Sequence, residues 1–269
     1  MRTMTLAMSM AFLAACGGEP GHQGTARKSS QAPVSPDVQS VSAMVMPELE
    51  LRDGSEVTGK VTWKGAALKP KKLKMGADPY CEGANTSPMN EETVVSEAGD
   101  VQWAFVYVSN PPAGKFEAPK EAVVIDQAGC VYKPHVFGIM AGQTLKIKNS
   151  DDTNHNIHAM GTLNPEFNMS QPRKGMENDK SFTTPEVGLM IKCDVHPWMK
   201  AWANVMTHPF FAVSGADGAF KIAGLPAGKY KVTIWHEALD GAKEVEVEVD
   251  GKAPKAGVNF ELNAKKEKK

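Results

Sequence analysis

An unbroken alternation of charged and apolar residues runs from residue 244 to residue 249, with valines on one face and glutamates on the other. A period of two residues is typical of a strand that buries one face and exposes the other. Residues 144–148 and 229–234 alternate in the same way, and turn pairs such as Asp217-Gly218 separate the runs. No window of helical length combines a 3.6-residue period with capping residues. The sequence therefore predicts an all-β chain that folds as sandwiches or barrels.

The length and charge of the chain narrow the classes of partner. A chain of 269 residues is long enough for two ordinary domains. Lys and Arg number 30 against 31 Asp and Glu, and no basic stretch is interleaved with aromatic residues. Nucleic-acid-binding proteins usually carry such a basic patch or stripe. We therefore expect no nucleic-acid partner.

The first residues indicate export rather than a folded element. Arg2 precedes an apolar run, residues 6–15, that is too short to span a bilayer as a helix. Small residues then lead into Cys16 and Gly17, and this ending resembles a bacterial lipoprotein signal. The resemblance implies cleavage before Cys16 and a lipid on its sulfur that anchors the chain to the membrane. Because no Asp follows the cysteine, we expect the outer membrane, on its periplasmic side. The alternative is an ordinary secretory signal with an incidental cysteine.

Three potential metal ligands follow one another at intervals of three residues: Cys193, His196 and Met199. Strand-like sequences at residues 187–192 and 201–206 flank them, so the three side chains are expected on one hairpin loop. A soft thiolate, an imidazole and a thioether together suit copper. Structural zinc sites more often contain additional cysteines.

A second imidazole comes from His155, which Asn156 follows, after the strand that ends near Asn149. With the Cys-x-x-His-x-x-Met loop, residues 129–206 resemble a small blue-copper protein of the plastocyanin and amicyanin kind, a cupredoxin. The resemblance implies a Greek-key β-sandwich that holds one type 1 copper ion. The equatorial ligands would be His155, Cys193 and His196, and Met199 would be the weak axial ligand. His158 is a competing ligand, and a chain without metal is the other alternative.

The same resemblance assigns roles to neighbouring residues. Asn156 would orient the two ligand segments by hydrogen bonding. Asp194 stands where family members often have Ser or Thr, so its contacts are open. An edge-exposed His196, with Pro197 and Trp198 as an apolar rim, would form the electron port against which a redox partner docks.

The remaining cysteines are expected to pair. If Cys16 carries lipid and Cys193 binds metal, Cys81 and Cys130 are left, and an oxidising compartment favours a disulfide. Such a bridge contributes on the order of 3–4 kcal/mol in the chain-entropy model. The alternative is two buried free thiols.

A second module follows the candidate copper segment. Residues 217–220 and 225–230 carry the patterns Asp-Gly-x-Phe and Leu-Pro-x-Gly-x-Tyr, which resemble a carboxypeptidase regulatory-like (transthyretin-like) β-sandwich. Residues 59–61 and 104–108 look like the first strands of that fold, although they precede the copper segment. We therefore expect one sandwich inserted into another; the alternative is three consecutive units, with residues 51–124 independent. The expected order is a signal peptide at 1–15, a flexible linker at 16–50, a regulatory-like sandwich from 51–124 and 208–263, a cupredoxin domain at 125–207 and a disordered tail at 264–269.

The leading functional hypothesis is one-electron transfer at the cell envelope, with a redox protein such as a cytochrome or a membrane oxidoreductase as partner. A second hypothesis is copper binding or storage without a redox role, in which Met160, Met169 and Met176 would take part. A third is a structural or binding-platform lipoprotein that has kept the fold without the metal. We do not expect an enzyme, because a second copper site, a Ser-His-Asp arrangement and paired carboxylates cannot be identified in the sequence.

Overall fold

The computed structural model of the chain describes residues 54–66, 68, 70–241, 244–255 and 257–264. They all belong to one compact unit that spans residues 42–269. The expected signal peptide, Cys16, the linker at 16–50 and residues 265–269 of the tail lie outside the described residues. Within the described part of the chain, no helix is both long and apolar enough to cross a membrane.

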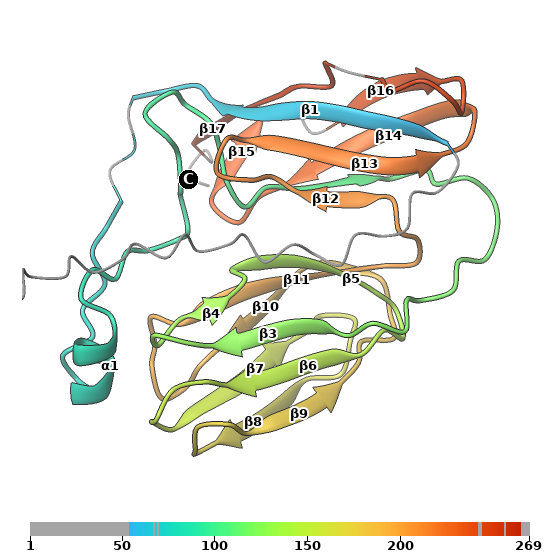
Figure 1. The fold of residues 1–269 in the computed structure, drawn as a ribbon. Coiled ribbons are helices and arrows are strands. Elements are labelled where there is room, and N and C mark those ends of the chain that lie inside the picture. Colours follow the sequence, from blue (N-terminus) through green and yellow to red (C-terminus); the bar gives the residue numbers. More distant parts are fainter. Residues whose placement is uncertain (1–53, 67, 69, 242–243, 256, 265–269) are drawn as a thin grey trace, which may run out of the picture. The chain divides into compact units, whose positions relative to one another are not determined.

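The prediction of an all-β chain is confirmed, since strands make four sheets and a single short helix is found among the described residues. Two of these sheets face each other in what we call the central sandwich (Figure 1). One has the strand order β5-β11-β10-β7-β8 and the other β4-β3-β6-β9. The strands are β3 (Val123–Gln127), β4 (Tyr132–Lys133), β5 (Val136–Met140), β6 (Leu145–Asn149), β7 (His155–Met160), β8 (Phe167–Gln171), β9 (Glu177–Lys180), β10 (Glu186–Lys192) and β11 (Lys200–Met206).

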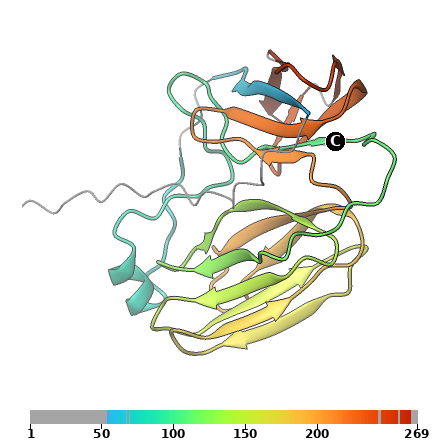
Figure 2. The same cartoon turned by 45° about the vertical axis from the view of Figure 1, so that its right-hand side comes forward.

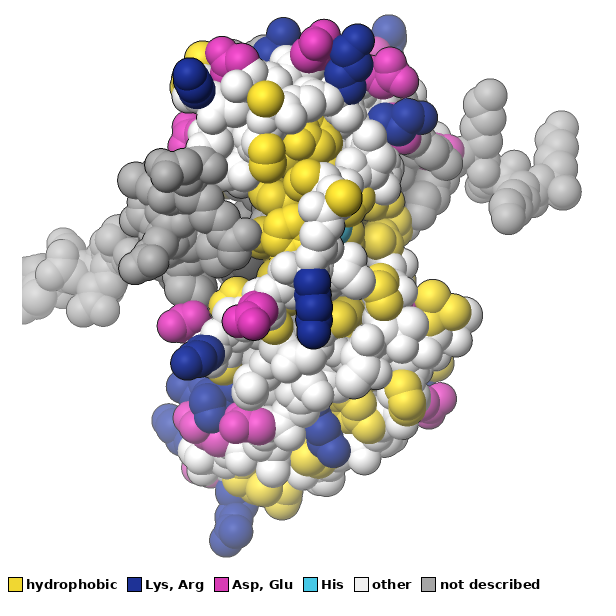
Figure 3. Space-filling view, turned by 90° about the vertical axis from the view of Figure 1, so that its right-hand side faces the viewer, with side chains coloured by type: hydrophobic (Ala, Val, Ile, Leu, Met, Phe, Trp, Pro, Cys, Tyr) yellow, Lys and Arg dark blue, Asp and Glu magenta, His cyan; other side chains and the backbone are white. Residues whose placement is uncertain are grey.

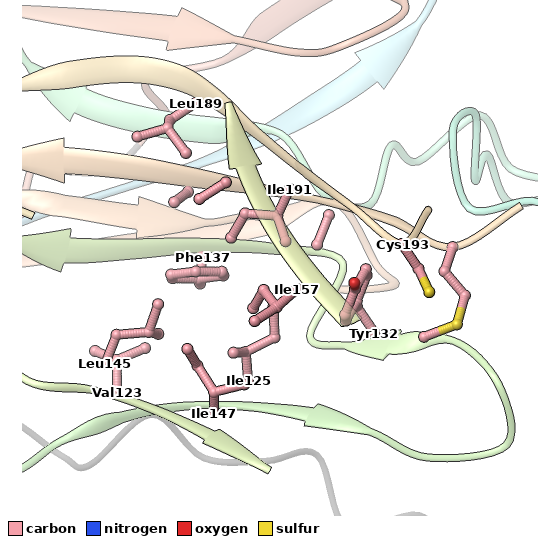
Figure 4. Packing of buried hydrophobic residues seen from close by; sticks show 14 of the residues in the cluster. Val123, Ile125, Tyr132, Phe137, Leu145, Ile147, Ile157, Leu189, Ile191 and Cys193 are labelled. Carbon is pink, nitrogen blue, oxygen red and sulfur yellow. The ribbon is translucent and has the colours of Figure 1, made fainter. Parts of the chain in front are cut away.

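The core of the central sandwich follows from the alternation seen in the sequence. Leu145 and Ile147 of β6 are fully buried, whereas the lysines between and after them are partly exposed. From the opposite sheet, Phe137 and Ile157 pack into the same cluster (Figure 4). Each such side chain contributes about 1.5–3 kcal/mol through burial. Figure 4 also shows Cys193 at one end of this core, so the candidate ligand loop starts from a well-packed base.

The other two sheets form what we call the flanking sandwich, because its strands come from both sides of the central sandwich in the sequence. Their strand orders are β13-β1-β17-β15 and β12-β2-β14-β16, and both contribute to one core. The strands are β1 (Ser55–Trp63), β2 (Phe105–Val108), β12 (Phe211–Val213), β13 (Ala219–Leu225), β14 (Gly228–Trp235), β15 (Leu239–Gly241), β16 (Glu244–Val249) and β17 (Phe260–Ala264).

Strand β1 holds the two ends of the flanking sandwich together. It pairs antiparallel with β13 and parallel with β17. Gly59 in this strand is required by a close approach, since a Cβ there would lie 1.7 Å from the carbonyl oxygen of Val258. The segment before residue 63 and the segment after residue 210 therefore build one sheet.

One helix was not predicted. It is α1 (Pro79–Ala84), with Asp78 as its N-cap and Pro79 in its first turn. Asp and Pro at these positions favour a helix start, but six residues are too few to show a helical period. We call residues 78–85 the cap segment. A disulfide between Cys81 and Cys130 fixes it to the loop between β3 and β4, and Figures 1 and 2 show α1 beside that end of the central sandwich.

Charged side chains are mixed on the surface. Figure 3 shows Lys and Arg interspersed with Asp and Glu over the face that it displays. Several of them form exposed ion pairs across strands, such as Lys231 with Glu244 and Lys146 with Asp179. Such pairs contribute little to stability, typically less than about 1 kcal/mol each.

Candidate metal centre

The candidate ligands meet because of the register between two strands. Lys192, at the end of β10, pairs with His158 of β7, and the two strands are antiparallel. The chain beyond Lys192 therefore continues alongside β7 toward its first residue, His155. Cys193 and His155 are brought to the same end of the sheet in this way.

Hydrogen bonds close the loop between β10 and β11. The backbone N–H of Cys193 donates to the carbonyl of Met199 at 3.2 Å, and the N–H of Met199 donates to the carbonyl of His196 at 2.9 Å. The N–H of His196 donates to Sγ of Cys193 at 3.4 Å. The loop is therefore a turn that its own backbone closes, and the same backbone holds Sγ of Cys193.

Three donor atoms converge at the base of this loop. Nδ1 of His155 lies 2.9 Å from Nδ1 of His196, and Sγ of Cys193 lies 3.9 Å from the same Nδ1 of His196. The donor atoms of these three residues all lie within 4.8 Å of one another. The side chains are almost completely buried, with exposed fractions of 0% for His155 and 2% for each of the other two. Met199 is also buried and belongs to the same core cluster as Cys193.

Two carboxylates decide which nitrogens of the imidazoles face each other. Nε2 of His155 lies 2.9 Å from Oδ2 of Asp151, and Nε2 of His196 lies 3.0 Å from Oδ2 of Asp78. A carboxylate accepts hydrogen bonds, so each Nε2 carries its proton. In neutral rings the two Nδ1 lone pairs then point at each other across 2.9 Å. Such an arrangement needs either an added proton or a cation between the rings.

The acid–base balance of the site agrees with this geometry. Burial lowers the pKa of His155, but hydrogen bonds to Asp151 and Cys193 outweigh it, so the pKa is raised. Burial also lowers the pKa of His196, and here the hydrogen bond to Asp78 does not compensate, so the pKa stays lowered. His155 is therefore the more basic of the two rings.

The surroundings of the Cys193 thiol favour its ionisation. Burial raises its pKa, but the hydrogen bond with His155 and those from the backbone of His196 and Val195 outweigh this effect. The pKa of the thiol is therefore lowered. A thiolate is the form that binds a metal ion.

Asn156 connects β7 to the ligand loop. Its Oδ1 accepts hydrogen bonds from the N–H groups of Asp194 at 2.7 Å and Val195 at 3.3 Å, and from Sγ of Cys193 at 3.3 Å. Asp194 in turn lies 2.9 Å from Nδ1 of His158. Nε2 of His158 lies 2.6 Å from Oε1 of Glu166, so both ring nitrogens already have partners away from the other donors.

The expectation of an edge-exposed His196 is wrong. The ring is 2% exposed because the cap segment covers it through Asp78 and the Cys81 sulfur, which lies 3.7 Å from Nε2. Pro197 is exposed, and Trp198 is partly buried, with its Nε1–H donating to the carbonyl of Cys130 at 3.0 Å. The expected rim is thus only partly at the surface.

Asp78 and Asp151 are the site residues that sequence analysis missed. Asp151 lies four residues before His155, within a run of polar residues that offers no distinguishing pattern. Asp78 is 118 residues from His196, and its only signal was the Asp-Pro pair of a helix start close to a cysteine. The methionines of the storage hypothesis are partly buried, and the strand register places Met160 opposite Met190 and Met169 opposite Ile157.

Solved structures similar to this chain include a nitrite reductase, an amicyanin and a cupredoxin. A Cu-containing nitrite reductase from Thermus scotoductus aligns with 36% of this chain at 23% identity and a TM-score of 0.29, and the alignment spans 25% of the reductase chain. A methionine mutant of amicyanin in the Cu(I) form aligns with 38% at 21% identity and a TM-score of 0.29, over 98% of its own length. A purple cupredoxin from Nitrosopumilus maritimus aligns with 31% at 24% identity and a TM-score of 0.27, over 98% of its own length.

No protein-family model matches the sequence, and no curated protein matches it. A metal centre is therefore inferred from the donor atoms of this chain alone.

Proposed function

We propose that the chain binds one copper ion, of type 1, through His155, Cys193, His196 and Met199, and that it transfers single electrons. The observation that carries the proposal is the convergence of two Nδ1 lone pairs and one thiol inside a buried site. Opposed lone pairs at this distance are unfavourable in a neutral chain, and a cation between them removes the conflict.

The donor set favours copper over other metals. One thiolate and two imidazoles, with a buried thioether nearby, match the trigonal His-Cys-His arrangement with a weak axial Met. Bound copper would supply a centre that changes oxidation state by one electron. The protein residues hold the donors: the hydrogen bonds of the loop restrict its movement, and burial excludes water. A site that keeps the same ligand positions in both oxidation states lowers the reorganisation that electron transfer requires.

We also propose a cellular location and a class of redox partner. With the lipoprotein-like sequence at Cys16, we place the protein at the outer membrane, facing the periplasm, as an electron carrier rather than an enzyme. Its partner would be a redox protein, either a cytochrome or a membrane oxidoreductase. Nucleic acid is not among the proposed partners.

Spectroscopy of the full chain tests the copper centre. We expect one equivalent of Cu(II), an intense thiolate-to-copper absorption band in the visible region and a matching electron-paramagnetic-resonance signal. Cys193→Ser should abolish the band. His158→Gln is the matched control, because His158 lies beside the site and has its own partners; it should leave the band in place. A wild-type chain without a Cys193-dependent band would exclude the proposal.

Copper binding without a redox role remains a second candidate, and the covered ring of His196 favours it. A partner that cannot reach an imidazole edge exchanges electrons slowly. The rate of electron exchange between the copper-loaded chain and a small redox protein separates the two candidates. Rapid exchange supports electron transfer, and copper that stays bound but exchanges no electrons supports the second candidate.

A further inference from the structure

We propose that Asp78 is a positioning residue for the metal centre: it holds His196 in the tautomer that aims the Nδ1 lone pair at the metal. This inference rests on the proposed function and deepens it. Asp78 is not one of the proposed ligands. It acts through the far nitrogen of the ring, at 3.0 Å.

The carboxylate of Asp78 is fixed at both oxygens. Oδ2 accepts from Nε2 of His196 and from Oγ1 of Thr153, the latter at 2.8 Å. Oδ1 accepts from the backbone N–H groups of Tyr80 at 2.8 Å and Cys81 at 3.3 Å. With both oxygens committed, the carboxylate cannot turn away from the ring, and it presents only an acceptor to Nε2.

The cap segment delivers Asp78 from outside the central sandwich. The disulfide between Cys81 and Cys130 fixes its middle, and the side chain of Asn85 donates to the carbonyl of Gly129 at 3.1 Å. The hydroxyl of Tyr80 lies 3.3 Å from Oδ1 of Asp151, the carboxylate that holds the other imidazole. The cap segment therefore touches the outer partners of both ring ligands.

The negative charge of Asp78 should affect copper affinity and the reduction potential in a definite direction. A carboxylate that accepts from the far N–H makes an imidazole a stronger donor to a metal. A stronger donor stabilises Cu(II) more than Cu(I), because the ion with the higher charge gains more. Removal of the carboxylate should therefore weaken Cu(II) binding more than Cu(I) binding and raise the reduction potential.

Asp78→Asn isolates this role. Asn is as good an N-cap as Asp, and its Oδ1 can still accept from Tyr80 and Cys81, so α1 should be retained. The amide NH₂ must then occupy the place of Oδ2, where it opposes the N–H of His196. Two donors in contact force the ring into the other tautomer, which removes the lone pair from Nδ1.

Glu82→Gln is the matched control. Glu82 lies in the same helix, is exposed, and loses the same charge in this variant without contacting His196. A shift that came only from the net charge of the cap segment would appear in both variants. A shift that came from positioning appears only in Asp78→Asn.

The first measurement is nitrogen-15 NMR of the imidazoles in the metal-free full chain. We expect a change of tautomer at His196 in Asp78→Asn and none in Glu82→Gln. The second measurement is metal affinity by competition with chelators. For Asp78→Asn we expect Cu(II) affinity to fall about 10–100-fold. For each factor of ten by which the loss of Cu(II) affinity exceeds the loss of Cu(I) affinity, the reduction potential rises by about 59 mV.

Equal tautomers and equal potentials in Asp78→Asn and Glu82→Gln would overturn the inference. Circular dichroism and a count of free thiols show whether each variant has folded with its disulfide intact. The NMR arm does not depend on copper. If Cys193→Ser showed the proposed function to be wrong, the tautomer of His196 would still decide whether Asp78 positions the ring.

Discussion

Sγ of Cys81 lies 3.7 Å from Nε2 of His196, so a disulfide forms part of the wall around the candidate metal centre. The bridge is completely buried at both of its cysteines. It joins the cap segment to the loop after β3, and both of these carry groups that contact the ring ligands or their carboxylates. A structural crosslink and a candidate ligand set thus share one end of the central sandwich.

Replacement of the bridge should destabilise the protein. Cys81 and Cys130 are 49 residues apart in sequence, and a closed loop of that size contributes about 4 kcal/mol in the chain-entropy model. We expect Cys81→Ser with Cys130→Ser to lower the free energy of unfolding by about this amount in urea. Wild-type protein that has been reduced and alkylated serves as the comparison. A double variant with the midpoint of the oxidised wild type would show that the bridge adds no stability.

Met199→Leu should separate packing from ligation. Leu has nearly the volume of Met, and such buried exchanges usually cost less than about 1.5 kcal/mol. We expect the variant to fold, to keep its copper and its visible band, and to have a higher reduction potential, since a donor to Cu(II) is lost. The measurement is a redox titration of the copper-loaded protein. An unchanged potential would remove Met199 from the ligand set.

Asn156→Ala should loosen the ligand loop. The variant leaves the N–H groups of Asp194 and Val195 without their acceptor. These hydrogen bonds are part-buried, and a typical one contributes about 0.5–1.5 kcal/mol, so thermal unfolding should occur at a lower temperature. Asn168→Ala, which alters an exposed neighbour of Asn156, is the control and should have a smaller effect. Equal losses in the two variants would contradict a special role for Asn156.

His208 should make stability depend on pH. Burial lowers its pKa to about 4, and its Nδ1 accepts from the N–H of Phe210 at 3.2 Å. An unfolded histidine titrates near 6.5. Between these values the unfolded chain binds the extra proton and the folded chain does not. Stability therefore falls as the pH drops from about 6.5 to about 4, by roughly 3 kcal/mol in total.

Urea unfolding at several pH values tests this prediction. His208→Gln cannot take up the proton, so its profile should be flatter than that of the wild type over the same interval. The two proteins should differ least in slope above pH 7, where neither form of His208 is charged. A wild-type profile as flat as that of the variant would show that His208 does not contribute.

Several strands and the candidate ligands were predictable from local pattern. Residues 144–148 alternate because β6 has one buried face. Cys193 and His196 are close in sequence, so one hairpin loop brings them together. His155 could be predicted as a ligand because it closely follows the end of a predicted strand, β6. In each of these cases the information lies within a few residues of the group concerned.

The cover over His196 was not predictable in the same way. It depends on Asp78, and no local pattern reports a hydrogen bond across 118 residues. The helix α1 is too short to produce a period, and the cap segment lies between strands with no repeated pattern of its own. The expectation of an exposed ring came from a family resemblance that does not extend to this segment. Contacts made by a short, irregular segment from a distant part of the chain require a structure.

The pairing of β1 has a consequence for the order in which the exported chain folds. This strand ends at Trp63, whereas its neighbours β13 and β17 begin at Ala219 and Phe260. With export as proposed, a chain that emerges N-terminus first presents the whole central sandwich before β1 can meet either neighbour. During that interval β1 is a strand with two open edges, which is a risk for pairing with another chain. The same order means that the cap segment and the ligand loop are complete while the flanking sandwich still waits for its last strand.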